Sequence, residues 1–315
     1  MNFSVIIPAY NEGDNIKATI IEVVTLMEKI TYINEVQIIV IDDHSTDNTY
    51  EIVSQMHYPF ITCLRLSRRS GSHVAIRAGL VEAVGDAVLC VSADGQDDPI
   101  VLKEMIEKWR RGAKTVWALR KDRENESWYY RKASNIFYFL VNFLNGDKGN
   151  VIDQSRADFF LIDRVVVNAI NSCVEVNFHL FGILGWLGFA QDTVEYNRRD
   201  RRYGKSKWSF RKKVFMAKEW ITAFTGMPLK LMTFIGFCFA SSGFLYAVYI
   251  IIFYFTENPA PGWSSIMVAI FVIGGVQMIM LGIIGEYLWR NLEEVRKRPL
   301  YFIEKKTKTQ NNNTT

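Results

Sequence analysis

Two adjacent carboxylates, Asp42 and Asp43, directly follow the apolar run Gln37–Ile41. Neighbouring carboxylates repel each other and are costly to bury. Capping of a helix explains Ser45 or Asp47 in the same stretch, but not the pair itself. Carboxylates at the end of a strand can accept hydrogen bonds from the imide N–H of a base and from ribose hydroxyls. A role in ligand binding therefore explains the pair better than capping does.

A second acidic cluster, Asp94-Gly95-Gln96-Asp97-Asp98-Pro99, is suited to a hard metal ion. The side-chain oxygens of Asp94 and Gln96, two positions apart in a turn, can face one cation. Mg²⁺ and Mn²⁺ prefer oxygen ligands and keep waters and phosphates in their coordination shells. The alternative is an acidic turn in which Asp98-Pro99 starts a helix.

A third cluster, Pro8-Ala9-Tyr10-Asn11-Glu12, lies at the end of the first strand-like run. Pro8 is expected to stop that strand sharply, and Tyr10 offers a ring face on which a base can stack. The alternative is a simple strand-to-helix turn with Asn15 as its N-cap.

Alternating strand-like and helix-like runs predict an α/β fold with a parallel sheet. The expected strands are Ser4–Pro8, Gln37–Ile41, Phe60–Leu66 and Ala87–Ser92, and the expected helices are Asn15–Ile30 and Val74–Val84. Sites in such sheets form beyond the carboxyl ends of the strands. The three clusters, together with the segment from Arg68 to His73, all follow strands, so we expect them to converge on one edge.

Two long uncharged segments predict transmembrane helices. Leu231–Phe255 has 25 residues without a charge, and Ser264–Gly285 has another 22. About 20 apolar residues cross the core of a bilayer as a helix. Two further stretches, 128–145 and 208–227, are aromatic, basic and amphipathic, as are helices that lie in the membrane interface. For 128–145 an ordinary core helix is an equal alternative.

The charges around the two segments predict their orientation. The connecting loop, Thr256–Ser264, carries Glu257 and neither Lys nor Arg, whereas both flanks are basic. The flanking basic residues are Arg198, Arg199, Arg201, Arg202, Lys205, Lys207, Arg211, Lys212 and Lys213 before, and Arg290, Arg296, Lys297, Arg298, Lys305 and Lys306 after. The positive-inside rule places both flanks in the cytoplasm and the loop outside. The polar tail Thr307–Thr315 is expected to be disordered.

Composition excludes several classes of protein. The four cysteines lie far apart with no CxxC pair, which argues against a disulfide framework and against a zinc site. The net charge of +4 is modest and clusters beside the predicted spans. This clustering fits anionic lipid headgroups or substrate phosphates rather than nucleic acid.

The three clusters, in this order and spacing, resemble family 2 glycosyltransferases of the GT-A fold. The remainder resembles the polyprenyl-phosphate branch, which includes dolichol-phosphate mannose synthases and, closer still, bactoprenol glucosyltransferases of the GtrB type. The likeness reaches about Lys306. The further motifs that carry it are Ser67-Arg68-Arg69-Ser70-Gly71-Ser72-His73, Trp186-Leu187-Gly188, Gly204-Lys205-Ser206-Lys207-Trp208, Gly285-Glu286-Tyr287-Leu288 and Arg298-Pro299-Leu300-Tyr301.

The resemblance implies an architecture and roles for particular residues. A cytoplasmic GT-A domain (1–207) would precede an interfacial helix (208–228), a two-helix transmembrane hairpin (229–289) and a cytoplasmic tail (290–315). Uridine would be held by Pro8, Tyr10, Glu12, Asp42 and Asp43; Mg²⁺ or Mn²⁺ by Asp94 and Gln96; and phosphates of donor or acceptor by Arg120, Arg131, Ser206 and Lys207. Asp158 stands where relatives have an active-site carboxylate, and with Asp94 it would be catalytic.

The sequence departs from the family pattern at two places. Relatives usually have Asp-Ala-Asp where this chain has Ser92-Ala93-Asp94, so one carboxylate beside the metal is replaced by a hydroxyl. Relatives commonly have Gly-Asp-Phe-Arg where this chain has Ala157-Asp158-Phe159-Phe160. The first departure bears on metal affinity, and both bear on the identity of the sugar.

The implied reaction is inverting transfer of a sugar, with glucose the first expectation, from a UDP-sugar to undecaprenyl or another polyprenyl phosphate. It would take place at the cytoplasmic face of the inner (plasma) membrane, in contact with membrane lipids, and a separate flippase would then be needed for any outer-face use. An anionic phosphate oxygen needs little help from a general base, so the enzyme's task is positioning and charge neutralisation.

Several alternatives stay open from the sequence. N-acetylglucosamine, galactose or a modified sugar can replace glucose, and the oligomeric state, a homo-oligomer included, is not fixed. A non-catalytic protein that binds or translocates a lipid-linked sugar is the rival from another class. A processive polysaccharide synthase would carry a Gln-x-x-Arg-Trp motif, which this chain lacks.

Overall fold

The computed structural model describes residues 1–97, 101–121, 157–173, 175, 180–197, 199, 227–256 and 262–307. Internal contacts divide the chain into two units. The first comprises Met1–Lys207 together with Arg298–Thr315, and the second comprises Trp208–Lys297. The segment after the second unit thus returns to the first.

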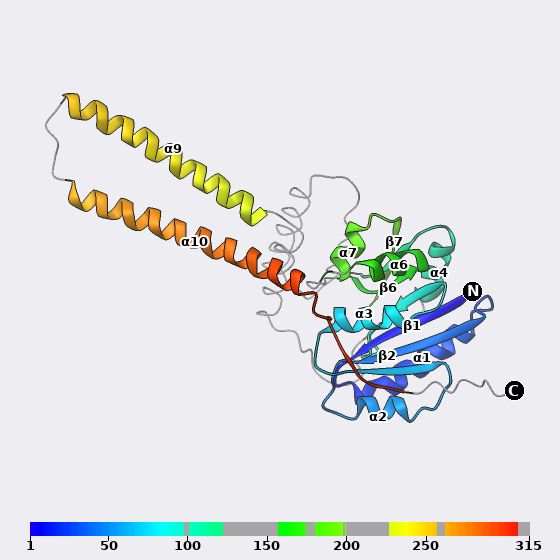
Figure 1. The fold of residues 1–315 in the computed structure, drawn as a ribbon. Coiled ribbons are helices and arrows are strands. Elements are labelled where there is room, and N and C mark those ends of the chain that lie inside the picture. The colour runs from blue at the N-terminus through cyan, green and yellow to red at the C-terminus, as the bar shows by residue number, and fades with distance from the viewer. Residues whose placement is uncertain are drawn as a thin grey trace. The chain divides into compact units, whose positions relative to one another are not determined.

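The first unit is built on one mixed sheet (Figure 1), which has eight strands among the described residues in the order β7-β5-β6-β4-β1-β2-β3-β8. The strands are β1 (Asn2–Ala9), β2 (Glu35–Asp42), β3 (Ile61–Leu66), β4 (Ala87–Cys90), β5 (Thr115–Arg120), β6 (Ala157–Asp163), β7 (Gln191–Tyr196) and β8 (Ile303–Lys306). Strands β1 to β4 are mutually parallel, whereas β6 and β8 run antiparallel to their neighbours. The α/β class is as expected, and the sheet is mixed.

Helices cover both faces of the sheet because its central strands are apolar on both faces. The helices of this unit are α1 (Gly13–Glu28), α2 (Thr49–Ser54), α3 (Ser72–Glu82), α4 (Leu102–Arg110), α6 (Arg164–Ser172) and α7 (Leu180–Trp186). Apolar side chains of α1, α2 and α4 share one core with alternate residues of β1. On the other face α3 lies close to β1 and β2, since a Cβ on Gly79 would come within 2.8 Å of Ile6 and 2.7 Å of Ile41.

The strands and helices expected between residues 4 and 92 are present, with small shifts at their ends, whereas the amphipathic helices expected over 128–145 and 208–227 lie almost wholly outside the described residues. The strand expected over Ala87–Ser92 ends at Cys90, because the N–H of Ser92 donates to the Asp97 carboxylate (2.6 Å). Strand β1 continues one residue past Pro8. Asn15 is not the N-cap of the first helix: α1 begins at Gly13, and Asn15 is a buried residue of its first turn.

The segment after the second unit adds β8 to the edge of the sheet. β8 pairs antiparallel with β3, and Thr307, which we expected to begin a disordered tail, is bonded in both directions to Cys63. The Cys63 N–H donates to the Thr307 hydroxyl (2.8 Å), and the Thr307 N–H donates to the Cys63 carbonyl (3.0 Å). β8 was not predicted from the sequence because all four of its side chains are exposed and show no apolar alternation. Only its backbone pairing with β3 identifies it as a strand.

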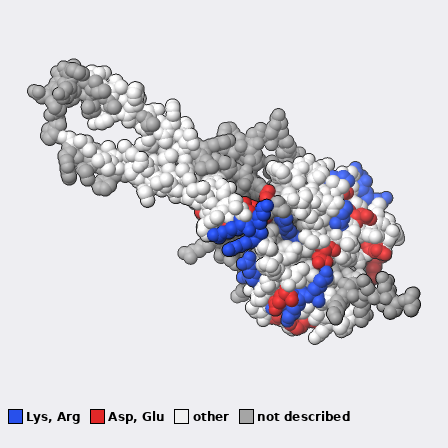
Figure 2. Space-filling view, viewed as in Figure 1, with Lys and Arg blue, Asp and Glu red and all other residues white. Residues whose placement is uncertain are grey.

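The second unit consists of two long helices, α9 (Met227–Thr256) and α10 (Trp263–Arg296). Their described surfaces carry few charges until the C-terminal end of α10 (Figure 2). Within the described residues, Val272–Arg296 is long and apolar enough to cross a membrane, and Met232–Tyr246 is a shorter apolar stretch. Of the two expected spans, one is therefore supported as a candidate, and the side chains between 247 and 271 lie largely outside the described part.

Helix α10 runs beyond residue 289, where we expected the hairpin to end. It ends at Arg296, and Lys297 takes the left-handed conformation (φ 47°) that commonly closes a helix. Pro299 follows two residues later and disfavours continuation of the helix.

Candidate active site

The sheet topology brings the predicted site residues to one edge. Strand β5 is antiparallel to β6, which is antiparallel to β4, so β5 and its parallel neighbour β7 point the same way as β1 to β4. The carboxyl ends of these strands therefore share an edge with the start of β6. Tyr10, Asp43, Asp94, Arg120 and the backbone of Asp158 all lie at that edge.

The loops that follow β1 and β2 are bonded to each other. The Asn11 N–H donates to the Ser45 hydroxyl (2.9 Å), and the Asn11 side-chain oxygen accepts from the Thr46 N–H (2.8 Å). Asp47 accepts from the N–H of Gly13 (3.0 Å). Asn11 takes a left-handed conformation (φ 53°), which Asn tolerates better than most residues. The two loops thus form one preorganised surface.

Asp42 lies buried beneath this surface and stabilises it. Its side chain is fully buried, and its carboxylate accepts from Arg65 Nη1 (2.7 Å) and from the N–H of Ser45 (3.0 Å). Arg65 Nη2 also donates to the Ser45 carbonyl (2.9 Å). In the structure the Asp42 carboxylate therefore stabilises the conformation of the loop after β2.

Asp43 joins the same surface to the loop that follows β3. Its two oxygens accept from the N–H groups of Ser70 (2.6 Å) and Gly71 (2.8 Å). Burial raises the pKa of the Asp43 carboxyl, and these hydrogen bonds and the nearby Arg69 offset that rise only in part. Gly71 has a φ of 93°, which favours glycine, so the loop can turn its N–H groups toward Asp43.

Tyr10 and Glu12 differ in what they offer a ligand. The guanidinium of Arg69 lies over the Tyr10 ring, 3.9 Å from its centroid, so an aromatic face is already a binding surface for a flat group. Glu12 accepts from the Asn15 side chain (2.8 Å), and its carbonyl accepts from Asn15 and Ile16. Glu12 therefore helps to start α1. Pro8 lies within β1, paired with Ile41.

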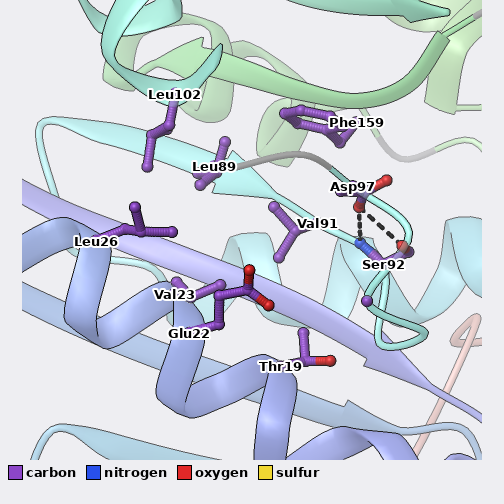
Figure 3. A pocket seen from close by; sticks show the side chains of 11 residues that line it. Thr19, Glu22, Val23, Leu26, Leu89, Val91, Ser92, Asp97, Leu102 and Phe159 are labelled. Carbon is purple, nitrogen blue, oxygen red and sulfur yellow. Dashed lines mark hydrogen bonds between the residues drawn. The ribbon is translucent and has the colours of Figure 1, made fainter. Parts of the chain in front are cut away.

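The loop after β4 gathers two carboxylates around one hydroxyl. Ser92 Oγ lies 2.7 Å from Asp94 Oδ1. It lies 2.8 Å from Asp97 Oδ2, a contact that is drawn in Figure 3. The N–H of Gln96 also donates to Asp94 Oδ1 (3.2 Å), and Gly95 makes the turn with a φ of 70°. Asp94 is 8% exposed, so it is largely buried in this loop.

The residues of this loop fit a cation that takes most of its ligands from a substrate. Among the described residues there is no group of three or more His, Cys, Asp or Glu that could hold a metal ion. Asp94 and Gln96 offer hard oxygen donors, and Mg²⁺ and Mn²⁺ complete such sets with phosphates and water. A diphosphate would supply what the protein does not.

The chain after β7 holds the loop after β4 in place. The N–H of Arg199 donates to the Gln96 carbonyl (3.1 Å), and Gln96 Nε2 donates to the Arg199 carbonyl (3.3 Å). The Arg199 guanidinium pairs with Glu22 of α1 (2.6 Å). Glu22 and Thr19 border an otherwise mostly apolar pocket beside this loop (Figure 3), lined also by Val23, Leu26, Leu89, Val91, Ser92, Gly95, Asp97, Leu102 and Phe159.

The predicted phosphate-binding residues are placed only in part. Arg120 ends β5, where the next N–H, that of Lys121, donates to the Tyr196 carbonyl (2.7 Å). Asp158 lies in β6, but its side chain is outside the described residues, as are Arg131, Ser206 and Lys207 entirely.

The profile described as glycosyl transferase family 2 matches residues 4–169, which is more than half of the chain and includes the loops above. The chain belongs to glycosyltransferase family 2. A second profile, the GtrB C-terminal hairpin, matches residues 227–290 of this glycosyltransferase and so covers most of α9 and α10.

Curated relatives match this glycosyltransferase over nearly its full length. A prophage-derived bactoprenol glucosyl transferase of Shigella flexneri is 38% identical over 97% of this chain and 98% of its own. An uncharacterized glycosyltransferase of Synechocystis is 37% identical, over 96% and 95%. Among solved structures, mannosyl-3-phosphoglycerate synthase from Rubrobacter xylanophilus has a TM-score of 0.50 and 20% identity, covering 70% of this chain and 72% of that one. It shares the fold.

Four residues that contact the site loops were not predicted. Asp97 belongs to the second acidic cluster, but we assigned it no role. Its contact with Ser92 is visible only in the structure. Arg65 is a charge inside an otherwise apolar strand, which is a usable signal for a buried partner. Arg199 and Glu304 lie about a hundred or more residues from their partners, and no local pattern reveals such contacts.

Proposed function

We propose that this glycosyltransferase transfers glucose from UDP-glucose to a polyprenyl phosphate, with inversion at the anomeric carbon. The observation that carries the proposal is the 38% identity to a bactoprenol glucosyl transferase over nearly the whole chain, hairpin included. The site supports it, since the hydrogen-bonded loops after β1, β2 and β3 and the acidic loop after β4 lie at the same edge of the sheet.

In this proposal the loops after β1, β2 and β3 bind the nucleoside. Tyr10 stacks on the uracil, and Asp43 orients the loop that closes over it, while Asp42 keeps the shape of the surface. Asp94 and Gln96 hold Mg²⁺ or Mn²⁺, which offsets the charge of the diphosphate when bound. Because the described residues offer few ligands, we expect donor and metal to bind together.

The acceptor phosphate is the nucleophile. One of its oxygens attacks the anomeric carbon in line with the departing UDP, and the bond to the diphosphate breaks. We assign charge neutralisation to Arg120, Arg131, Ser206 and Lys207, which would bring two polyanions together. Asp158, at the start of β6, is assigned the remaining catalytic carboxylate.

We further propose that α9 and α10 both span the membrane. Both ends of this hairpin connect to the first unit, because the chain from Arg298 onward belongs to it. Two spans would therefore leave the catalytic unit on one face and the loop on the other. The distribution of Lys and Arg supports a cytoplasmic position for the catalytic unit, on the side where nucleotide sugars are available.

A transfer assay with purified protein tests the proposal. UDP-sugars labelled in glucose, N-acetylglucosamine or galactose are each incubated with undecaprenyl phosphate and Mg²⁺ or Mn²⁺, and label in the lipid extract is counted. We expect glucose to be transferred fastest. Faster transfer of another sugar would replace glucose, and the absence of transfer from any donor would favour the binding or translocation alternative.

A further inference from the structure

Residues that follow the hairpin contact β3, the strand that leads into the loop containing Arg69, Ser70 and Gly71. β8 lies against β3, and the N–H of Ser67, directly after β3, donates to the carbonyl of Phe302 (2.9 Å). The side chain of Glu304, on β8, reaches Arg65 on β3, with Oε2 3.2 Å from Nε. The end of the fold thus contacts the strand that leads into the donor loops.

Arg65 connects Glu304 to those loops. Its guanidinium donates to Glu304 from Nε, to Asp42 from Nη1 and to the Ser45 carbonyl from Nη2. Ser45 in turn accepts from the N–H of Asn11. A continuous chain of bonds therefore runs from β8 to the residue that follows Tyr10.

The geometry of a guanidinium explains how the loss of one bond can affect the others. Its donors lie in one rigid plane, so acceptors at three of its nitrogens fix the orientation of the whole group. Without the carboxylate at Nε, the Arg65 plane can tilt between its two remaining partners. Asp42 is fully buried, so it depends on the fixed position of that plane.

We propose that Glu304 is a positioning residue for the donor nucleotide. It acts on the Asp42–Ser45 loop through Arg65 and through His44 of that loop, whose Nδ1 lies 3.7 Å from Glu304 Oε2. This inference rests on the proposed function, because it takes the occupant of the loop to be a uridine diphosphate. It assigns to the segment after the hairpin a part in donor binding, separate from any part in anchoring.

The same strand provides a matched control. Lys306 of β8 pairs with Glu82 of α3 at 2.7 Å, and Glu82 is partly exposed (30%), much as Glu304 is (41%). In the described part of the chain, the Glu82 carboxylate bonds to Lys306 and not to the loops after β1 or β2. Glu82→Gln therefore removes an ion pair from β8 without touching the chain of bonds to Ser45.

The experiment compares UDP binding to full-length proteins in detergent by isothermal titration calorimetry with Mn²⁺. Glu304→Gln should weaken UDP binding about two- to fivefold, the range for one partly exposed ion pair. It should raise the KM for the UDP-sugar by a similar factor and leave kcat within about twofold. Glu304→Asp should recover part of the affinity, and Glu82→Gln should bind like the wild type.

Two results would overturn the proposal: UDP binding by Glu304→Gln equal to the wild type, or an equal loss in Glu82→Gln. Thermal melts identify a general loss of fold, which would lower both variants together. Failure of the proposed function is distinguishable, because it shows as wild-type protein that binds UDP but transfers no sugar, and the comparison of UDP affinities is then still decisive.

Discussion

Single residues in the loop after β4 show how a departure from the expected family pattern is accommodated. Ser92 replaces a carboxylate, and its hydroxyl lies between Asp94 and Asp97. The loop thus keeps two carboxylates close together, with a neutral hydrogen-bonding group between them. The acidic cluster could be predicted from the sequence, but the position of Ser92 between its two carboxylates could not. In the same way, Asp42 and Asp43 could be recognised as candidates, but the bond from Arg65 to Asp42 could not be predicted.

Asp94→Asn tests the assignment of the metal. We expect the single-turnover rate to fall by about 100-fold or more, because a preorganised charge at the departing diphosphate is lost. The melting temperature should stay close to the wild type, since an amide can still accept from Ser92 and Gln96. If the variant is active, Asp94 is not a metal ligand. If the variant is unfolded, the role of Asp94 is structural.

Ser92→Asp tests the bridging position. The new carboxylate would lie beside Asp94 and Asp97, and three like charges should lower the melting temperature without metal and raise the pKa of one of the group. Added Mn²⁺ should recover more stability than in the wild type, because the commoner family pattern is restored. Much weaker Mn²⁺ binding in a titration would place Ser92 away from the metal.

At the scale of elements, the apolar pattern predicted β1 to β4 but neither β5 nor β6, although those two strands are buried as well. β1 and β2 are continuous β-branched runs, and the structure places them within two residues of the expected ends. β8 was missed because four residues with exposed side chains carry no apolar pattern, and backbone pairing alone defines it. β7 has only two buried side chains, Val194 and Tyr196, and was not predicted either.

Asp163 joins three elements and offers a test of their cohesion. It caps α6 by accepting from the N–H of Val165 (2.9 Å), and it also accepts from Trp109 of α4 (2.8 Å) and Lys114 (2.9 Å). Asp163→Ala should cost about 2 kcal/mol, from a lost cap and an unsatisfied indole N–H. For a unit of this size the melting temperature should fall by about 4 to 8 °C.

The same residue predicts a dependence on pH. Burial raises the pKa of Asp163, but the bonds from Val165, Lys114 and Trp109 outweigh it, so the pKa lies below the ordinary value. The stabilisation is present above the unfolded pKa of about 3.9 and is lost as pH falls through the lower folded pKa. Melts of wild type and Asp163→Asn should therefore converge below about pH 4, and a constant difference would contradict this.

At the scale of the whole molecule, the sequence predicted a soluble unit followed by a hairpin, but not the return of the chain to the sheet. Charge distribution and apolar length are local signals, whereas pairing of β8 with β3 joins segments more than two hundred residues apart. That return ties both ends of the hairpin to the catalytic unit.

Labelling of cysteines tests the resulting topology. In a Cys238→Ser background, a membrane-impermeant maleimide added to intact cells should label a cysteine at Asn258 or Ser264 and should miss one at Asn312. Permeabilised cells control for access, since all three positions should then react. The reverse pattern in intact cells would refute both the orientation and a cytoplasmic nucleotide sugar as the donor.

The position of β8 in the chain also sets an order of events during biosynthesis. The ribosome adds about 5 to 20 residues per second, so several seconds separate Lys207 from the strand that completes the sheet. During that interval α9 and α10 leave the ribosome, while β3 carries a row of unpaired N–H and C=O groups that another chain can join. A soluble version truncated at Lys207 would keep this edge open permanently, whereas a flexible linker from Lys207 to Arg298 would let the newly made sheet close.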